Sequence, residues 1–119
     1  NSTVTLLKNR IIVLQFPQNA LFDVPDAIEV DQAYAKYAGK DSYKSLVDAR
    51  NAFGSMTKEA KQHFANNDIL QGQRLAEAIL VNNVGNQLMA NFYITFHQPN
   101  NPCKVFTDIN KALKWLNEF

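Results

Sequence analysis

The stretch 43–57 carries the polar side chains with the clearest potential for chemistry. An apolar-ended run reaches Asp48 and Arg50, and Ser55 and Thr57 follow where a helix can begin. In open α/β sheets, ligands bind beyond the carboxyl ends of the strands. Asp48, Arg50, Ser55 and Thr57 are therefore the candidate interaction site or phosphorylation site.

The two hydroxyl residues allow two interpretations. A Ser or Thr at a helix start commonly serves as the N-cap, and Thr57 is the better choice because Glu59 suits the positive end of the helix dipole. Alternatively, Ser55 or Thr57 is phosphorylated, or the free amides of the helix start bind an anion. Asp48 likewise either pairs with the next loop or contributes to a ligand site.

Polar residues also follow the next two predicted strands. Asn82 and Asn83 end one strand, and Asp108 follows the other, where it can also cap a helix. The carboxyl ends of parallel strands share one edge of a sheet, so Asn82, Asn83 and Asp108 form a candidate ligand rim beside Asp48. No pair of carboxylates at a defined spacing indicates acid–base catalysis.

Sequence motifs for covalent or metal catalysis are absent. The chain lacks HExxH, CxxC, GxSxG and the glycine patterns that bind phosphate. His63 and His97 fall on different predicted helices, and Cys103 is expected to be a buried, unreactive thiol. We therefore expect no catalytic residue, no metal and no cofactor, and a protein that is not an enzyme.

The composition is that of an ordinary globular protein. At 119 residues, with 46% hydrophobic and 19% charged residues, the chain is expected to form a single domain over 1–119. A net charge of +1 without a basic block argues against nucleic-acid binding. The single cysteine, and the absence of a secretory signal and of an apolar run long enough to span a membrane, lead us to expect a cytoplasmic protein.

Hydrophobic periodicity predicts an α/β fold with a mixed, mainly parallel five-stranded sheet flanked by helices. The first two strands form an antiparallel hairpin, and the whole order is β-β-α-β-α-β-α-β-α. The predicted strands cover 4–7, 11–16, 43–48, 75–81 and 103–106. The predicted helices cover 24–38, 58–67, 84–96 and 109–119.

The segment 84–96 is the most ambiguous part of this prediction. Although 92–96 alone would pass as a strand, the length of the pattern favours a helix. Its apolar residues at helical spacing are Leu88, Met89, Phe92, Tyr93 and Phe96. Most of this stripe is expected to be core, but part of it could form a dimer or partner surface or line an apolar pocket.

Six segments together carry a resemblance to a known family: LVDAR at 46–50, SMTKEA at 55–60, AILVN at 78–82, LMANFY at 88–93, KVFT at 104–107 and ALKWL at 112–116. In these and in its order of elements, the chain resembles small bacterial STAS-like proteins, the fold group of the SpoIIAA-like anti-sigma-factor antagonists. The resemblance covers essentially the whole chain and implies a SpoIIAA-like fold.

In the anti-sigma antagonists, a serine at the start of the helix after the central strand is phosphorylated by a partner kinase, and its charge controls partner binding. That position falls at 54–57 here. The Asp-Ser-Ser-Gly run of the family is absent, so Ser55 and Thr57 occupy the neighbourhood without the motif.

Three functions remain open. The first is a non-enzymatic regulatory or protein-interaction domain of STAS-like type that binds an unknown protein partner through Asp48, Ser55 and Thr57. The second is a small-molecule or lipid-binding protein, since related SpoIIAA-like folds include lipid-binding members. The third, which the missing catalytic motifs disfavour, is an enzyme that uses Asp48 with Asn82 or Asp108. A homodimer is also expected, because a small domain of this kind has exposed apolar candidates.

Overall fold

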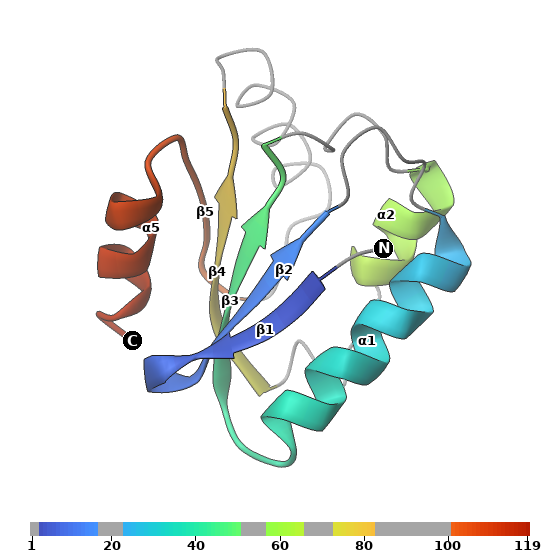
Figure 1. Cartoon of the computed structure of the whole chain (residues 1–119), viewed down its shortest axis with the longest axis horizontal. Coiled ribbons are helices and arrows are strands. Elements are labelled where there is room, and N and C mark those ends of the chain that lie inside the picture. Colours follow the sequence, from blue (N-terminus) through green and yellow to red (C-terminus); the bar gives the residue numbers. More distant parts are fainter. Residues whose placement is uncertain (1–2, 17–22, 51–56, 66–72, 83–100) are drawn as a thin grey trace.

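The computed structural model describes residues 3–16, 23–50, 57–65, 73–82 and 101–119, and its strands form one five-stranded sheet in the order β1-β2-β3-β4-β5 (Figure 1). The strands are β1 (Thr3–Leu7), β2 (Ile11–Gln15), β3 (Tyr43–Asp48), β4 (Arg74–Leu80) and β5 (Cys103–Phe106). β1 pairs antiparallel with β2, and the pairs from β2 to β5 are all parallel. The predicted mixed sheet is therefore confirmed, with strand ends within one residue of those expected.

The described helices cover both faces of the sheet. They are the 3₁₀ turn η1 (Lys8–Arg10) and the helices α1 (Val24–Ala38), α2 (Lys58–Ala65) and α5 (Ile109–Leu116). α1 and α2 lie on one face and α5 lies on the other (Figure 1). Three predicted helices are thereby confirmed in position, while the helix predicted at 84–96 lies outside the described residues.

Helix α1 begins and ends where its sequence signals place it. The Asp23 carboxylate accepts a hydrogen bond from the Val24 amide at 2.7 Å, and Asp26 accepts one from the Asp23 amide at 3.0 Å. This reciprocal pair is a capping box, which satisfies amides that the first turn leaves free. At the other end, Gly39 has φ +60°, a conformation that a side chain disfavours, so the helix stops there.

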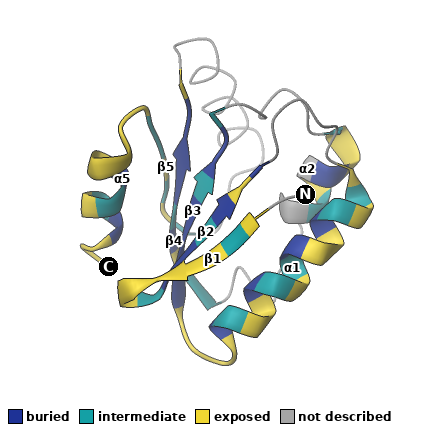
Figure 2. Cartoon of the chain, viewed as in Figure 1, coloured by how far each residue is buried: buried dark blue, intermediate teal, exposed yellow. Residues whose placement is uncertain are grey.

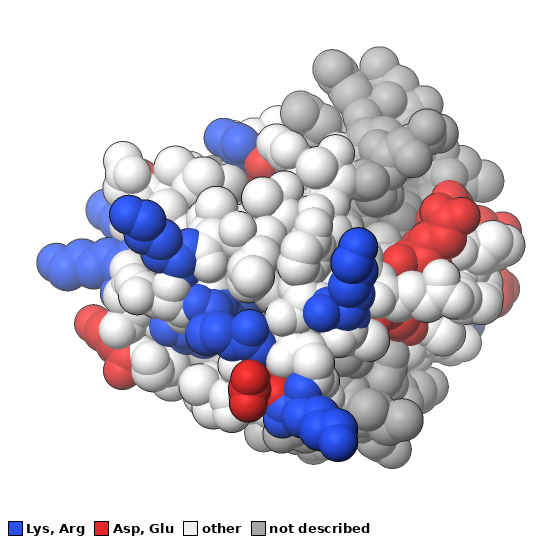
Figure 3. Space-filling view, turned by 60° about the horizontal axis from the view of Figure 1, so that its bottom comes forward, with Lys and Arg blue, Asp and Glu red and all other residues white. Residues whose placement is uncertain are grey.

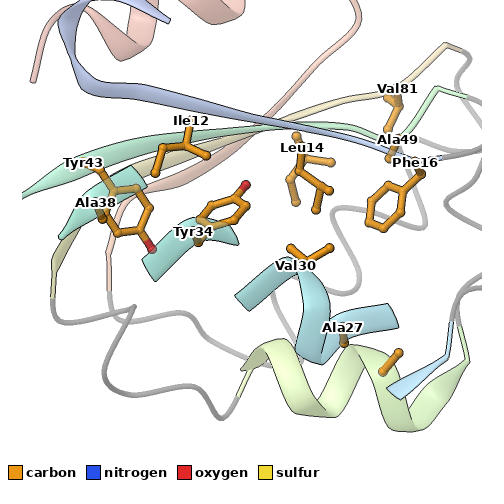
Figure 4. Packing of buried hydrophobic residues seen from close by; sticks show 12 residues of the cluster. Ile12, Leu14, Phe16, Ala27, Val30, Tyr34, Ala38, Tyr43, Ala49 and Val81 are labelled. Carbon is orange, nitrogen blue, oxygen red and sulfur yellow. The ribbon is translucent and has the colours of Figure 1, made fainter. Parts of the chain in front are cut away.

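The hydrophobic core is divided by the sheet into two clusters. Side chains alternate along β3, so Tyr43 packs in the cluster on the α1 face and Leu46 packs in the cluster on the α5 face. Figure 4 shows Val30 and Tyr34 of α1 directed toward the side chains of β2 on the first of these faces. Because the central strands are covered on both sides, they are buried, whereas β1 is largely exposed (Figure 2).

Arg10 ties the hairpin turn to the end of α1. Its Nη1 and Nη2 atoms donate to the carbonyl oxygens of Tyr37 and Ala38 at 3.1 and 2.7 Å, and its Nε donates to that of Ser42 at 3.1 Å. These carbonyls include the last ones of α1, which have no partner within the helix. A positive group also opposes the negative end of the helix dipole, so Arg10 stabilises this end of α1 twice over.

Charged side chains gather at opposite edges of the sheet, although they are dispersed along the sequence. Around the amino ends of the parallel strands lie Lys8, Arg10, Lys36, Lys40, Asp41, Lys44, Arg74, Glu77, Lys114 and Glu118. Around the carboxyl ends lie Asp23, Asp26, Asp48, Arg50, Lys58, Glu59, Asp108 and Lys111. Figure 3 shows the basic side chains spread over the first of these edges. Among the described residues, the first edge is thus mainly positive, and the second carries more acidic than basic side chains.

Replacing Arg10 by Ala should destabilise the protein. The variant leaves the three carbonyl oxygens without their charged donor, and we expect the free energy of unfolding to fall by about 2 kcal/mol in urea titrations. Lys8→Ala, at an exposed neighbour, is the control and should change it by less than about 0.5 kcal/mol. Equal losses in the two variants would show that Arg10 does not hold α1.

Candidate functional site

The carboxyl end of β3 holds two of the predicted site residues in direct contact. Oδ1 of Asp48 accepts hydrogen bonds from the backbone amide of Arg50 at 3.2 Å and from its Nε at 2.9 Å, and Oδ2 accepts one from Nη2 at 2.8 Å. The Gln15 amide donates to Oδ2 at 3.4 Å. The side chain of Asp48 is 9% exposed and that of Arg50 is 43% exposed. Asp48 therefore orients an arginine that still faces solvent.

The electrostatics of this pair keep both groups charged. Burial alone would raise the pKa of the Asp48 carboxyl, but the hydrogen bonds and the charge of Arg50, with the hydrogen bond from Gln15, bring it below its ordinary value. The hydrogen bond to Asp48 and its charge raise the pKa of Arg50. A general base works best with a pKa near the operating pH, so Asp48 is poorly suited to that role.

Thr57 is the N-cap of α2, as the sequence predicts. Its Oγ1 accepts a hydrogen bond from the Ala60 amide at 3.1 Å and donates one to Oδ1 of Asp23 at 3.0 Å. The same carboxylate caps α1, so a single hydroxyl links the starts of two helices. A phosphate on this oxygen would lose the bond that it donates and would stand beside a carboxylate. Phosphorylation stays a prediction, and Ser55 lies outside the described residues.

The ends of β3, β4 and β5 lie side by side, as the predicted rim requires. The Ala49 amide donates to the carbonyl of Leu80 at 2.8 Å, and the Val81 amide donates to that of Phe106 at 2.9 Å. Asn82 follows directly and is exposed at this edge. Asn83 lies outside the described residues. The prediction that the carboxyl ends of these three strands lie next to one another is thus confirmed.

Asp108 has a structural task at the same edge. Its Oδ1 accepts hydrogen bonds from the amides of Asn110 at 2.8 Å and Lys111 at 3.4 Å, which makes it the N-cap of α5. The capping role that the sequence offered for Asp108 is confirmed. Its carboxylate is directed to its own helix, whereas Asp48 bonds to Arg50 and Gln15, so the described bonds do not join them into one cluster.

Sequence reasoning missed a layer of buried and half-buried polar groups on the α1 face of the sheet. The hydroxyls of Tyr34 and Ser45 are hydrogen-bonded at 2.8 Å, and Nη1 of Arg74 contacts Oε2 of Glu77 at 2.9 Å. Nε of Arg74 also donates to Asn101 at 2.9 Å. The signal was a charged residue, Glu77, inside an apolar strand with a basic residue three positions before it. Arg74 lies one residue before the predicted strand 75–81, so the strand pattern alone does not pair it with Glu77.

This layer contains the single cysteine. Cys103 is half-buried and is the register partner of Glu77 on the neighbouring strand. Burial and the charge of Glu77 raise the pKa of the Cys103 thiol, and burial also raises the pKa of the Tyr34 hydroxyl. Since the thiolate is the reactive form, the environment of Cys103 favours an unreactive thiol.

Two further observations concern metals and membranes. His63 of α2 pairs with Asp31 of α1, while His97 lies outside the described residues. Within the described ranges, no three or more His, Cys, Asp and Glu side chains are placed to hold a metal ion. In the same part of the chain, none of the helices has the length and apolar character needed to span a membrane.

A family model described as a domain of unknown function (DUF7793) matches residues 5–119. The chain belongs to this family. A search of the curated proteins gave no match. Among solved structures, the DUF7793 chain is similar to an uncharacterised protein of the DUF3478 family with a SpoIIAA-like fold from Shewanella loihica PV-4. The TM-score is 0.71 at 14% identity, over 98% of this chain and 92% of that one. The predicted SpoIIAA-like fold is thereby confirmed.

A second solved structure, a protein of unknown function from Arthrobacter sp. FB24, is 25% identical over 98% of this chain and all of its own length. Its TM-score is 0.36. The family match and the fold likeness leave the molecular function to be argued from the residues themselves.

Asp48→Asn should change how stability depends on pH. The folded-state pKa of Asp48 lies below its unfolded value, so its stabilising contribution is present above about pH 4 and disappears as the pH falls through the folded-state pKa. The wild type should be more stable than the variant at pH 7 in urea titrations, and this difference should shrink toward pH 3. Asp41→Asn, in an exposed loop, is the control, and a difference that is constant with pH would contradict the assignment.

Thr57→Val should weaken the start of α2. The valine keeps the shape but removes the acceptor for Ala60 and the donor for Asp23, which should lower the free energy of unfolding by about 1 kcal/mol. Thr57→Ser retains the hydroxyl and should stay close to wild type in the same thermal and urea measurements. If Ser and Val destabilise equally, the methyl packing of Thr57 matters and its hydrogen bonds do not.

Proposed function

We propose that the chain is a non-enzymatic regulatory or protein-interaction domain of STAS-like type. It binds a protein partner through a docking surface formed by Arg50, the Asp48 that orients it, and the start of α2 at Thr57. The SpoIIAA-like fold is consistent with this role, and the single cysteine is consistent with a cytoplasmic location.

The observation that carries the proposal is the state of Arg50. Its guanidinium is fixed by two hydrogen bonds to one carboxylate, yet the side chain remains 43% exposed. An arginine pre-organised in this way has lost part of its rotamer freedom before a partner arrives, and it still offers N–H donors. Arginine is enriched among the residues that dominate the affinity of protein interfaces.

The surroundings of Arg50 favour binding over catalysis. The Asp48 carboxylate is fully engaged and its pKa is lowered, and the Thr57 hydroxyl both donates and accepts a hydrogen bond. Groups occupied in this way are suited to hold a surface in shape rather than to take up or release protons.

The alternative, a small-molecule or lipid-binding protein, depended on the aromatic stripe that includes Phe92, Tyr93 and Phe96. These residues lie outside the described part of the chain. The alternative therefore stays a prediction, and native mass spectrometry of the purified protein tests it through a bound mass.

Arg50→Ala should remove partners that bind through this surface. We expect such partners to be depleted at least about tenfold in affinity capture with quantitative mass spectrometry, because a hot-spot arginine contributes about 2 kcal/mol or more to binding. Arg50→Lys keeps the charge but loses the planar fork and should give an intermediate loss. Lys36→Ala, which removes an exposed cation in the last turn of α1, away from this surface, is the control and should leave the captured partners unchanged. If the captured proteins are the same with Arg50→Ala as with wild type, this surface is not the docking site.

A further inference from the structure

Strand β1 lies at the edge of the sheet and has one neighbour among the described strands. It pairs with β2 in an uninterrupted antiparallel register, from Thr3 opposite Gln15 to Leu7 opposite Ile11. The opposite side of β1 has no strand beside it in the described part of the chain, and its outward backbone groups have no described strand to pair with. Such an edge is a template for pairing with another chain.

The two edge strands of the sheet differ in how well they are protected. β5 has four residues, carries the exposed Lys104 in its middle and is preceded by Pro102, and each of these features discourages pairing with another chain. β1 has five residues, Thr-Val-Thr-Leu-Leu, with no charge, no proline and no bulge. Threonine, valine and other β-branched residues also favour strands. β1 therefore contains neither the charge nor the proline that discourages another chain from pairing with β5.

Apolar side chains flank the edge of β1 that faces away from β2, on both faces of the sheet. Leu6 is 39% exposed and Leu7 is 41% exposed, and as neighbours in a strand they point to opposite faces of the sheet. Figure 2 shows β1 largely exposed beside the buried central strands. These leucines would gain contacts if the sheet continued beyond β1.

We infer that β1 pairs antiparallel with β1 of a second copy of the chain, so that the two sheets join into one continuous sheet. The strand is self-complementary about Thr5: a twofold axis there places Thr5 opposite Thr5 and Val4 opposite Leu6 of the other copy. No charged residues face each other in this pairing, and Leu6 meets an apolar partner. A twofold interface also closes on itself, which limits the assembly to a dimer.

This interface is separate from the docking surface around Arg50. β1 is two strands away from β3, whose carboxyl end holds Asp48 and Arg50. The homodimer expected from the sequence thus acquires a specific interface, and it does not require the proposed function to be correct. Arg50→Ala should leave the dimer intact.

Charge substitutions at Thr5 test the pairing. Thr5 is exposed, and Thr5→Glu or Thr5→Lys would place two like charges at the twofold axis. In sedimentation velocity, wild type should have the mass of a dimer, and each variant should dissociate about fivefold more readily or worse. Mixing the two variants should restore the dimer, since a Glu now faces a Lys. Thr107→Glu, exposed next to β5, should remain dimeric, and circular dichroism should confirm that each variant is folded.

A cross-link provides a second readout that does not depend on charge. Directly opposed residues of an antiparallel pair lie within disulfide distance, so Thr5→Cys should form a disulfide-linked dimer under mild oxidation. Wild type, with Cys103 alone, and Thr107→Cys should not. A monomeric wild type overturns the inference, as does a dimer that Thr5→Glu and Thr5→Lys leave unchanged or that Thr5→Cys fails to cross-link.

Discussion

Four neighbouring strands of the sheet, β2 to β5, run parallel, and this alignment determines where the remaining parts must go. Each connection between parallel strands must carry the chain back to the amino ends of the strands. The carboxyl ends of the four strands therefore lie together on one side of the molecule, and the C-terminal ends of the connecting helices lie on the other. The carboxyl edge accordingly holds the pair Asp48 and Arg50 together with Asn82 and Asp108, which are distant from that pair in the sequence. The same alignment places the end of α1 beside the hairpin turn, where Arg10 can bond to its carbonyl oxygens.

Most polar side chains at the carboxyl edge are committed to the fold. Asp23 and Thr57 link the starts of α1 and α2, Asp108 caps α5, and Asp48 binds Arg50. The buried polar layer on the α1 face follows the same rule, because its described side chains find hydrogen-bond partners within the chain. Side chains that these hydrogen bonds fix in position, while leaving them exposed, are suited to form a recognition surface. Arg50 is such a side chain, because Asp48 fixes its guanidinium and it remains exposed.

Sequence patterns identified the strands, the described helices, and the caps at Thr57 and Asp108, because those signals lie within a few neighbouring residues. Contacts that depend on how distant segments meet were not predictable in this way. The hydrogen bond between Thr57 and Asp23 joins residues 34 apart, and Arg10 reaches carbonyls 27 and 28 residues away. The charges also looked evenly dispersed along the chain, since their separation arises only when helices and strands fold against one another.

Among the described residues, that separation of charge corresponds to an electric dipole along the parallel strands, although the net charge of the chain is only +1. When a charged molecule approaches such a dipole, the electrostatic interaction both attracts the two molecules and turns them relative to each other. An anionic body would first meet the edge around Lys8 and Lys40, and a cationic one would first meet the edge around Asp26 and Glu59. The relative orientation of the two molecules is therefore biased before they touch. This electrostatic effect acts over about one Debye length, about 8 Å at physiological salt, and added salt would shorten that distance.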